Sequence, residues 1–352
     1  MRCGLNRLSV LLLIFLLACT GRAGSGNNRQ GGLATGQVIP DIKCRDYPSY
    51  SYSLYLPKGY TETERLPVYV AFDPGSKGIL PVTRYSELAE KYRFILVGSN
   101  DSRNGLPPEQ TIRIAKALIS EVQSRFGADP TRIFLTGFSG GARVSCFVGM
   151  SVSKVQGVIG CGAGLQETDQ QPVHSFRYFV IAGEADPNLS EVIIQDQLLS
   201  QARWDHRLMI IPGGHAWPPP AEMEKAILWM RGELPPLPVE DRRLADFYEI
   251  DRETTLRNTL LTHFISGDTT WMKREIRKLK EQSHNAKNTN DSLIAKRLLG
   301  FLGLMSWSNS TAQLNNGLLD RAYLSLTIYR MTEPENPAVD SLFNVYYQKR
   351  NP

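Results

Sequence analysis

The strand-to-helix turn around Ser139 constrains this chain more than any other feature. Residues 132–136 form an apolar, β-prone run, and Gly137-Phe138-Ser139-Gly140-Gly141 follows it directly before further small residues at 142–145. Glycines two places before and after a serine remove Cβ atoms that would collide where a strand turns sharply into a helix. The pattern predicts a tight turn that exposes the Ser139 side chain, although glycines also make ordinary loop turns.

Two later runs place polar side chains at strand ends. Residues 176–182 are typical of a buried strand and lead to Asp186, and residues 207–211 lead in the same way to His215. Because carboxyl ends of parallel strands meet at one edge of a sheet, both side chains are expected beside Ser139. A serine hydroxyl needs a base to take its proton, and a carboxylate can orient an imidazole. The sequence thus predicts Ser139 as nucleophile, His215 as base and Asp186 as acid.

Each residue also has a plainer interpretation. Asp186-Pro187 could begin a turn or cap a helix, and His215 could belong to a surface loop. The rival histidines, His174 and His206, precede predicted strands and therefore belong to the opposite edge. The shared edge and the chain order serine, aspartate, histidine favour a catalytic site over a degraded one.

Strands and helices alternate through the front part of the chain. Additional strands are expected at residues 66–72 and 94–97, and helices at 85–92, 108–126 and 221–231. The strand runs are apolar on both faces, which is typical of a parallel sheet covered by helices. The predicted class is α/β, with a mostly parallel sheet.

These features, together with residues 52–60 and 128–132, resemble the α/β-hydrolase superfamily, particularly esterases similar to feruloyl esterases and polyhydroxybutyrate depolymerases. The resemblance covers residues 41–235. It implies an α/β-hydrolase fold and a serine hydrolase that cleaves short-acyl, feruloyl or polymer-attached carboxylic esters, including esters on polysaccharides, through an acyl-enzyme. A serine peptidase of the prolyl-oligopeptidase type shares the fold and the residue order and is an alternative. An inert hydrolase fold that serves as a binding platform is another.

A tetrahedral intermediate also needs N–H donors for its oxyanion. Gly140, directly after the nucleophile, is the expected first donor. The loop at residues 73–78 is placed to supply the second, and because Pro74 has no N–H, Gly75 or Ser76 is favoured. This loop differs from the His-Gly-Gly type of many lipases and esterases, which leaves the accepted acyl groups open.

Trp217, two residues after His215, is a further candidate. Its indole could line the cleft and contact substrate. Aromatic residues near strand ends more often pack in the core, however, so this is a weak expectation.

Cysteine usage and charge limit the ligands of this chain. Cys146 and Cys161 lie in apolar surroundings, and with Cys44 they make an odd set, so buried thiols are expected rather than a disulfide. Their spacing and the lack of clustered histidines give no zinc pattern, and no metal or cofactor is expected. The net charge of +5 would fall to +3 on loss of Arg2 and Arg7 with the N-terminal segment, which is too small and dispersed for a nucleic-acid surface.

The N-terminus resembles a bacterial lipoprotein signal. Basic residues at 1–7 precede an apolar stretch at 8–18 that is too short to span a bilayer, and Leu16-Leu17-Ala18-Cys19 resembles a lipobox. Cys19 would then be the lipidated first residue, with an ordinary signal peptide as the alternative. Residues 19–40, rich in Gly, Ser and Asn, are expected to be a flexible tether. The predicted location is the bacterial cell envelope, lipid-anchored to a membrane and facing the periplasm or the cell surface.

A proline-rich stretch at residues 233–238 marks a domain boundary. Beyond it, residues 236–352 are expected to form a helical domain, because apolar residues recur at helical spacing in 244–264, 271–279, 293–307 and 318–331. Residues 322–337 resemble the end of a tetratricopeptide helix pair, without a clear full-length repeat beside it. Such a domain could bind a protein partner, cap the cleft or buttress the hydrolase.

Overall fold

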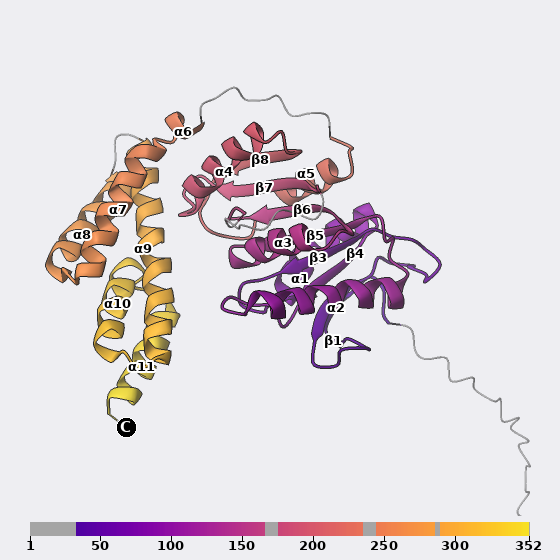
Figure 1. Ribbon diagram of the computed structural model, residues 1–352, viewed down its shortest axis with the longest axis horizontal. Helices are drawn as coiled ribbons and strands as arrows, with labels where there is room; N and C mark the ends of the chain where they lie inside the picture. Colours follow the sequence, from indigo (N-terminus) through magenta and orange to yellow (C-terminus); the bar gives the residue numbers. More distant parts are fainter. Residues whose placement is uncertain (1–32, 166–174, 235–243, 286–288, 352) are drawn as a thin grey trace, which may run out of the picture. The chain divides into compact units, whose positions relative to one another are not determined.

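An eight-stranded sheet forms the centre of the front part of the chain (Figure 1). The strands are β1 (Val38–Lys43), β2 (Ser51–Tyr55), β3 (Val68–Phe72), β4 (Ile95–Ser99), β5 (Ile133–Phe138), β6 (Val155–Cys161), β7 (Arg177–Gly183) and β8 (His206–Ile211). Their order in the sheet is β1-β2-β4-β3-β5-β6-β7-β8. β2 pairs antiparallel with β1 and β4, and all other neighbours are parallel.

Residues 33–165, 175–234, 244–285 and 289–351 are described in this computed structural model. The predicted signal peptide, Cys19, His174 and most of both the tether and the proline-rich linker lie outside these residues.

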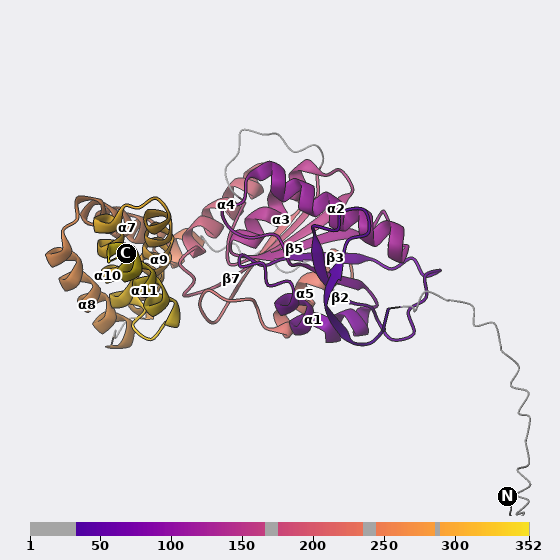
Figure 2. The ribbon, with the colours of Figure 1, turned by 90° about the horizontal axis from the view of Figure 1, so that it is seen from below.

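Helices cover both faces of the sheet. They are α1 (Ile79–Tyr92), α2 (Pro108–Phe126), α3 (Gly140–Ser151), α4 (Leu189–Gln201) and α5 (Pro220–Met230). Figure 2 shows α2, α3 and α4 on one face and α1 and α5 on the other. Beneath α1 and α5, a buried cluster includes Tyr69, Tyr85, Phe179 and Trp229. The α/β fold class expected from the sequence is confirmed.

Local chemistry explains where these elements begin and end. Every residue of β3 is buried, as its uninterrupted apolar run predicts for a central parallel strand. α2 has the predicted bounds, with Pro108 in its first turn and Gly127 in a left-handed conformation at its end. α1 begins at Ile79, six residues before the predicted start at residue 85. The helix can include Pro81 because this residue lies in the first turn, where backbone N–H groups have no partner within the helix.

β1 was not anticipated from the sequence. It begins at Val38, inside the segment expected to be a tether up to residue 40, so that boundary was placed too late. Val38 pairs with Tyr55 and Ile39 with Leu54 in the antiparallel register. After a register shift, Ile42 pairs with Tyr52 and Lys43 with Ser51, so β-branched residues opposite aromatic and aliphatic ones extend the sheet here.

The C-terminal part is helical, as predicted. It contains α6 (Leu244–Phe247), α7 (Ile250–Ser266), α8 (Thr269–Asn285), α9 (Thr289–Asn315), α10 (Leu319–Thr332) and α11 (Pro337–Arg350). From α7 onward each helix packs on the next one in the chain. Helices α7 to α10 share a core that includes Leu260, Ile276, Leu298 and Leu302. The helix α11 was not predicted, although Pro337 at its first position and the cap of Asn336 on the Ala338 N–H are typical start signals.

Ala34–Pro352 forms one compact unit. Among the described residues, no helix is long and apolar enough to cross a membrane.

Candidate active site

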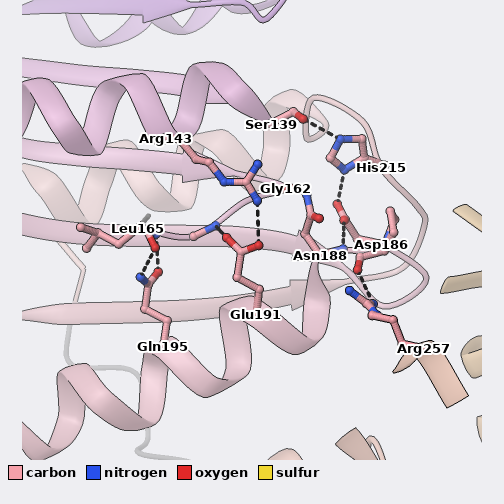
Figure 3. Close-up of polar contacts among 12 residues, drawn as sticks. Ser139, Arg143, Gly162, Leu165, Asp186, Asn188, Glu191, Gln195, His215 and Arg257 are labelled. Atoms are coloured by element: carbon pink, nitrogen blue, oxygen red, sulfur yellow. Dashed lines mark hydrogen bonds and ion pairs between the residues drawn. The ribbon is translucent and has the colours of Figure 1, made fainter. Parts of the chain in front are cut away.

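Ser139 occupies the sharp turn between β5 and α3. Its backbone angles are φ 53° and ψ −121°, a region that residues with a Cβ rarely adopt. Its N–H donates to the Cys161 carbonyl on the neighbouring strand β6 at 2.8 Å. The turn is therefore anchored to the sheet, and its strained backbone directs the side chain away from it (Figure 3).

Two glycines make this turn possible, as the sequence indicated. A Cβ on Gly137 would lie 2.1 Å from the Gly141 carbonyl oxygen, and a Cβ on Gly141 would lie 1.9 Å from the Phe72 carbonyl oxygen. Both distances are far below contact distance and involve backbone atoms, so larger residues would force the helix away from the sheet.

The structure brings Ser139, His215 and Asp186 into one hydrogen-bonded chain. His215 Nε2 lies 2.9 Å from Ser139 Oγ, and His215 Nδ1 lies 2.9 Å from Asp186 Oδ2 (Figure 3). An ionised carboxylate only accepts hydrogen bonds, so Nδ1 carries the proton and Nε2 is free to accept one from the hydroxyl. This is the tautomer that a general base for Ser139 needs.

Asp186 is fully buried, and both of its carboxylate oxygens have partners. Oδ2 accepts from His215, and Oδ1 accepts from the Asn188 N–H at 2.8 Å. A buried carboxylate is stabilised only when such donors satisfy it. The loop after β7 thus holds the acid in one orientation.

Gly162, just after β6, is a residue that the sequence analysis missed. Its φ is +65°, and a Cβ there would lie 2.9 Å from Asp186 Oδ2 and 3.2 Å from His215 Nδ1. Its carbonyl accepts from the Asn188 side chain at 2.8 Å. The glycines at positions 160, 162 and 164 were the available signal, since Gly within or beside a strand often marks a close approach of other groups.

His206 lies at the start of β8, on the opposite edge of the sheet from His215. Its Nδ1 contacts the Trp204 carbonyl at 2.8 Å, and its Nε2 lies 3.1 Å from the Asp196 carboxylate. These contacts belong to packing at that edge, as the sequence indicated.

The expected oxyanion donors differ in their availability. Gly140 is the first residue of α3, where an N–H has no partner within the helix. The Gly75 N–H donates to Asp73 Oδ1 at 2.9 Å, and the Ser76 N–H donates to the Asp73 carbonyl at 3.3 Å. Either N–H would have to give up its hydrogen bond to Asp73 before it could donate to a substrate oxyanion. The role of Gly75 and Ser76 as oxyanion donors therefore stays a prediction.

Trp217 packs beneath this loop. Its indole N–H donates to Asp73 Oδ2 at 3.1 Å, and its ring lies against Tyr85 and Phe138. The indole thereby helps to hold the Asp73 carboxylate that organises the loop. A direct contact between Trp217 and substrate stays a prediction.

 A hollow of ≈ 530 Å³ opens beside Ser139. Its walls include Arg103, Asn104, Leu106 and Phe147. A second hollow of ≈ 340 Å³ reaches His215 and is lined by Pro187, Trp307 and Glu333, among others. Ser139 and His215 are therefore each accessible from a hollow.

A charged group near the turn, Arg143, is already paired. Arg143, on α3, donates to Glu191 Oε2 at 2.7 Å, and Glu191 Oε1 also accepts from the Gly164 N–H at 3.2 Å (Figure 3). The guanidinium thus joins α3 to α4 next to the site. An anionic substrate would have to compete with Glu191 for it.

The thiols near the turn are not competing nucleophiles. Cys44, Cys146 and Cys161 are free and buried, and burial of Cys146 and Cys161 was expected from the sequence. Burial raises the pKa of the Cys146 thiol to about 12 and moves the pKa of Cys161 well above its ordinary value. The reactive thiolate is therefore suppressed at both positions at neutral pH.

Within residues 33–165, 175–234, 244–285 and 289–351, no group of three or more His, Cys, Asp or Glu side chains could hold a metal ion.

Comparisons with known proteins give distant likenesses. No family model matches the chain, and no curated protein matches it. A hyperthermophilic esterase from the archaeon Pyrobaculum calidifontis is 16% identical, covers 56% of this chain and 86% of its own, and has a TM-score of 0.45. An S-formylglutathione hydrolase from Staphylococcus aureus is 14% identical, with coverages of 56% and 99% and a TM-score of 0.45. A mutant feruloyl esterase module from Clostridium thermocellum, complexed with sinapinate, is 12% identical, with coverages of 55% and 86% and a TM-score of 0.44. Identities this low leave the function to be inferred from the site itself.

Proposed function

We propose that this chain is a serine hydrolase that cleaves carboxylic esters through an acyl-enzyme. The observation that carries the proposal is the continuous hydrogen-bonded chain from Ser139 Oγ through His215 to the buried Asp186, with 2.9 Å at both steps. A strained serine at a strand-to-helix turn, an imidazole in the correct tautomer and a buried carboxylate are the parts that this chemistry requires.

The proposed reaction begins when Ser139 Oγ attacks the ester carbonyl carbon and transfers its proton to His215 Nε2. Asp186 holds the imidazole and stabilises the positive charge that forms on it. The carbonyl oxygen becomes an oxyanion, which the Gly140 N–H stabilises at the first turn of α3. The C–O bond to the alcohol then breaks, and His215 returns the proton to the departing oxygen. A water molecule, deprotonated by His215, releases the acid by the reverse sequence.

The hollow beside Ser139 supports an acyl group of moderate size. It combines apolar walls from Leu106, Val144, Phe147 and Met150 with the exposed guanidinium of Arg103. A volume of ≈ 530 Å³ accommodates short-acyl and aromatic acyl groups such as feruloyl, and its open mouth is compatible with esters attached to a polymer.

The proposed location follows from the N-terminal sequence. Cys19 would be lipidated after removal of residues 1–18, and the enzyme would act at a membrane of the bacterial cell envelope. Labelling of cells with a radioactive fatty acid, followed by purification of wild type and Cys19→Ser, tests this part separately. Equal labelling of the two proteins would contradict it.

Fluorophosphonate labelling tests the proposed activity without requiring the correct ester. We expect wild type to react covalently, Ser139→Ala to remain unlabelled, and Ser124→Ala, which removes an exposed hydroxyl of α2, to behave as wild type. A panel of acetyl, butyryl, feruloyl and long-chain esters would then define the acyl preference. Folded wild type that resists the probe would refute an activated serine.

A further inference from the structure

The loop that carries Asp186 is held from two directions. From the hydrolase side, the N–H groups of Glu184 and Ala185 donate to the carbonyls of Ile211 and Gly213, at 2.8 and 2.9 Å. The Asp186 N–H donates to the Gly183 carbonyl at 3.0 Å. These bonds use the donors of the loop and leave its outward carbonyls to other partners.

Those carbonyls are met by two arginines from the C-terminal helices. Arg297, on α9, donates through Nη1 to the Glu184 carbonyl at 2.8 Å. Arg257, on α7, donates through Nη2 to the Pro187 carbonyl at 2.7 Å (Figure 3). Glu184 and Pro187 flank Asp186, so both sides of the acid receive a charged donor from a segment far along the chain.

One buried carboxylate fixes both arginines. Glu253 Oε2 accepts from Arg297 Nε at 2.6 Å, and Glu253 Oε1 accepts from Arg257 Nη2 at 2.8 Å. Only 1% of the Arg297 side chain and none of the Glu253 side chain is exposed. Charged groups are rarely buried so completely unless each one is paired and hydrogen-bonded. Arg297 Nη2 also donates to the Tyr248 carbonyl at 3.2 Å, which helps to hold this guanidinium in place.

Close packing reinforces these bonds. A Cβ on Gly300, on α9, would lie 3.3 Å from the ring of Pro187, so the helix backbone closely approaches the residue after the acid. The Arg257 guanidinium also lies 4.5 Å from the centre of the Phe301 ring, which limits its movement. At Gly300, α9 therefore packs closely against the loop that carries Asp186.

We propose that Arg257 and Arg297 are positioning residues that hold Asp186 against His215, which makes the C-terminal helices a working part of the active site. This inference rests on the proposed serine hydrolase function. It assigns these helices a role in catalysis itself, beyond binding a partner or supporting the fold.

A purely structural role of the same contacts predicts a different result. If the arginines only stabilise the protein, their removal lowers stability and affects the reaction equally whether or not position 186 carries a carboxylate. If they act through Asp186, their effect depends on that carboxylate. Residues that act through one another give non-additive effects, so a double-mutant cycle separates the two cases.

The test uses the full chain and Arg257→Met. Removal of Arg297 would leave Glu253 buried without its strongest partner and could unfold the protein, whereas Arg257 is partly exposed. Arg252→Met is the matched control. Arg252 lies on the same helix and pairs with Glu249 and Asp291 at 2.8 and 2.7 Å. The readouts are the fluorophosphonate reaction rate, kcat and KM for p-nitrophenyl acetate, and the urea midpoint.

We expect Arg257→Met to lower kcat and the labelling rate about 10-fold with little change in KM, as expected for a small misplacement of a catalytic group. Arg252→Met should keep the wild-type rates, and Arg257→Lys, which retains a cationic donor, should recover most of the activity. In an Asp186→Asn background, Arg257→Met should cause no further loss.

Three results would overturn the inference in distinguishable ways. An equal loss in both backgrounds would make Arg257 structural. Wild-type rates in Arg257→Met would show that the contact does not position the acid. Wild type that fails to react with the probe would remove the proposed function, and the positioning role with it.

Discussion

The backbone strain at Ser139 makes a prediction that can be measured without any substrate. At φ 53° and ψ −121° a residue with a Cβ is strained, whereas glycine tolerates this region. Ser139→Gly and Ser139→Ala both remove the hydroxyl and its hydrogen bond to His215. They differ only in the Cβ, so the difference in their free energies of unfolding reports the strain.

The expected difference follows from two opposing effects. Relief of strain at such a position is worth about 1–3 kcal/mol. The greater conformational freedom of glycine in the unfolded chain costs about 0.5–1 kcal/mol. We therefore expect Ser139→Gly to be more stable than Ser139→Ala by about 1 kcal/mol, the difference between the middles of these two ranges.

Urea unfolding of the two variants, followed by tryptophan fluorescence, provides the measurement. If the free energy of unfolding falls with urea concentration at the same slope in both variants, their urea midpoints can be compared directly, because this slope reports the surface exposed on unfolding. Ser124→Gly against Ser124→Ala, within helix α2, is the control, and there glycine should be the less stable variant by about 1 kcal/mol. If Ser139→Gly is no more stable than Ser139→Ala, the backbone at the turn is not strained and the account of the elbow is wrong.

Three further predictions concern the surroundings of the site. Gly162→Ala should lower kcat/KM by about 10- to 100-fold with little change in fold, because the new Cβ would lie 2.9 Å from Asp186 Oδ2. Steady-state kinetics measures the activity and circular dichroism checks the fold. Wild-type activity in this variant would contradict the prediction. Glu253→Ala should lower the free energy of unfolding by about 3–5 kcal/mol, because Arg297 would stay buried without its carboxylate. In the same denaturation assay, Glu249→Ala should lower it by at most about 1 kcal/mol, because the pair of Glu249 with Arg252 is exposed. The buried thiol of Cys146, with its pKa raised to about 12, should resist iodoacetamide from pH 7 to 9 and react after unfolding. Peptide mass spectrometry measures the alkylation. Alkylation of Cys146 in the folded protein at pH 8 would show that its thiolate is accessible.

Features set by neighbouring residues were predictable from the sequence. The start and end of α2 follow from Pro108 and Gly127, and the apolar run of β3 fixes a central strand. The turn at Ser139 was predictable for the same reason, because the glycines it needs lie within two residues of the serine. In each case the chemistry that decides the structure is local.

Other features depended on pairing that the sequence does not display. β1 extends the sheet because it pairs with β2. The N–H groups of Gly75 and Ser76 both donate hydrogen bonds to Asp73. Neither outcome has a strong local pattern, since strands are defined by their neighbours and short polar loops satisfy their own hydrogen bonds.

The sequence by itself determined the alternation of strands and helices, the strained turn and the edge of the sheet at which Ser139, Asp186 and His215 lie, because periodicity and glycine placement act over a few residues. Only the tertiary structure decided how the acid loop is held. Arg257 lies 70 residues from Pro187, and Arg297 lies 113 residues from Glu184. A hydrogen bond between such distant residues depends on how α7 and α9 pack in three dimensions, which no local pattern of side chains encodes.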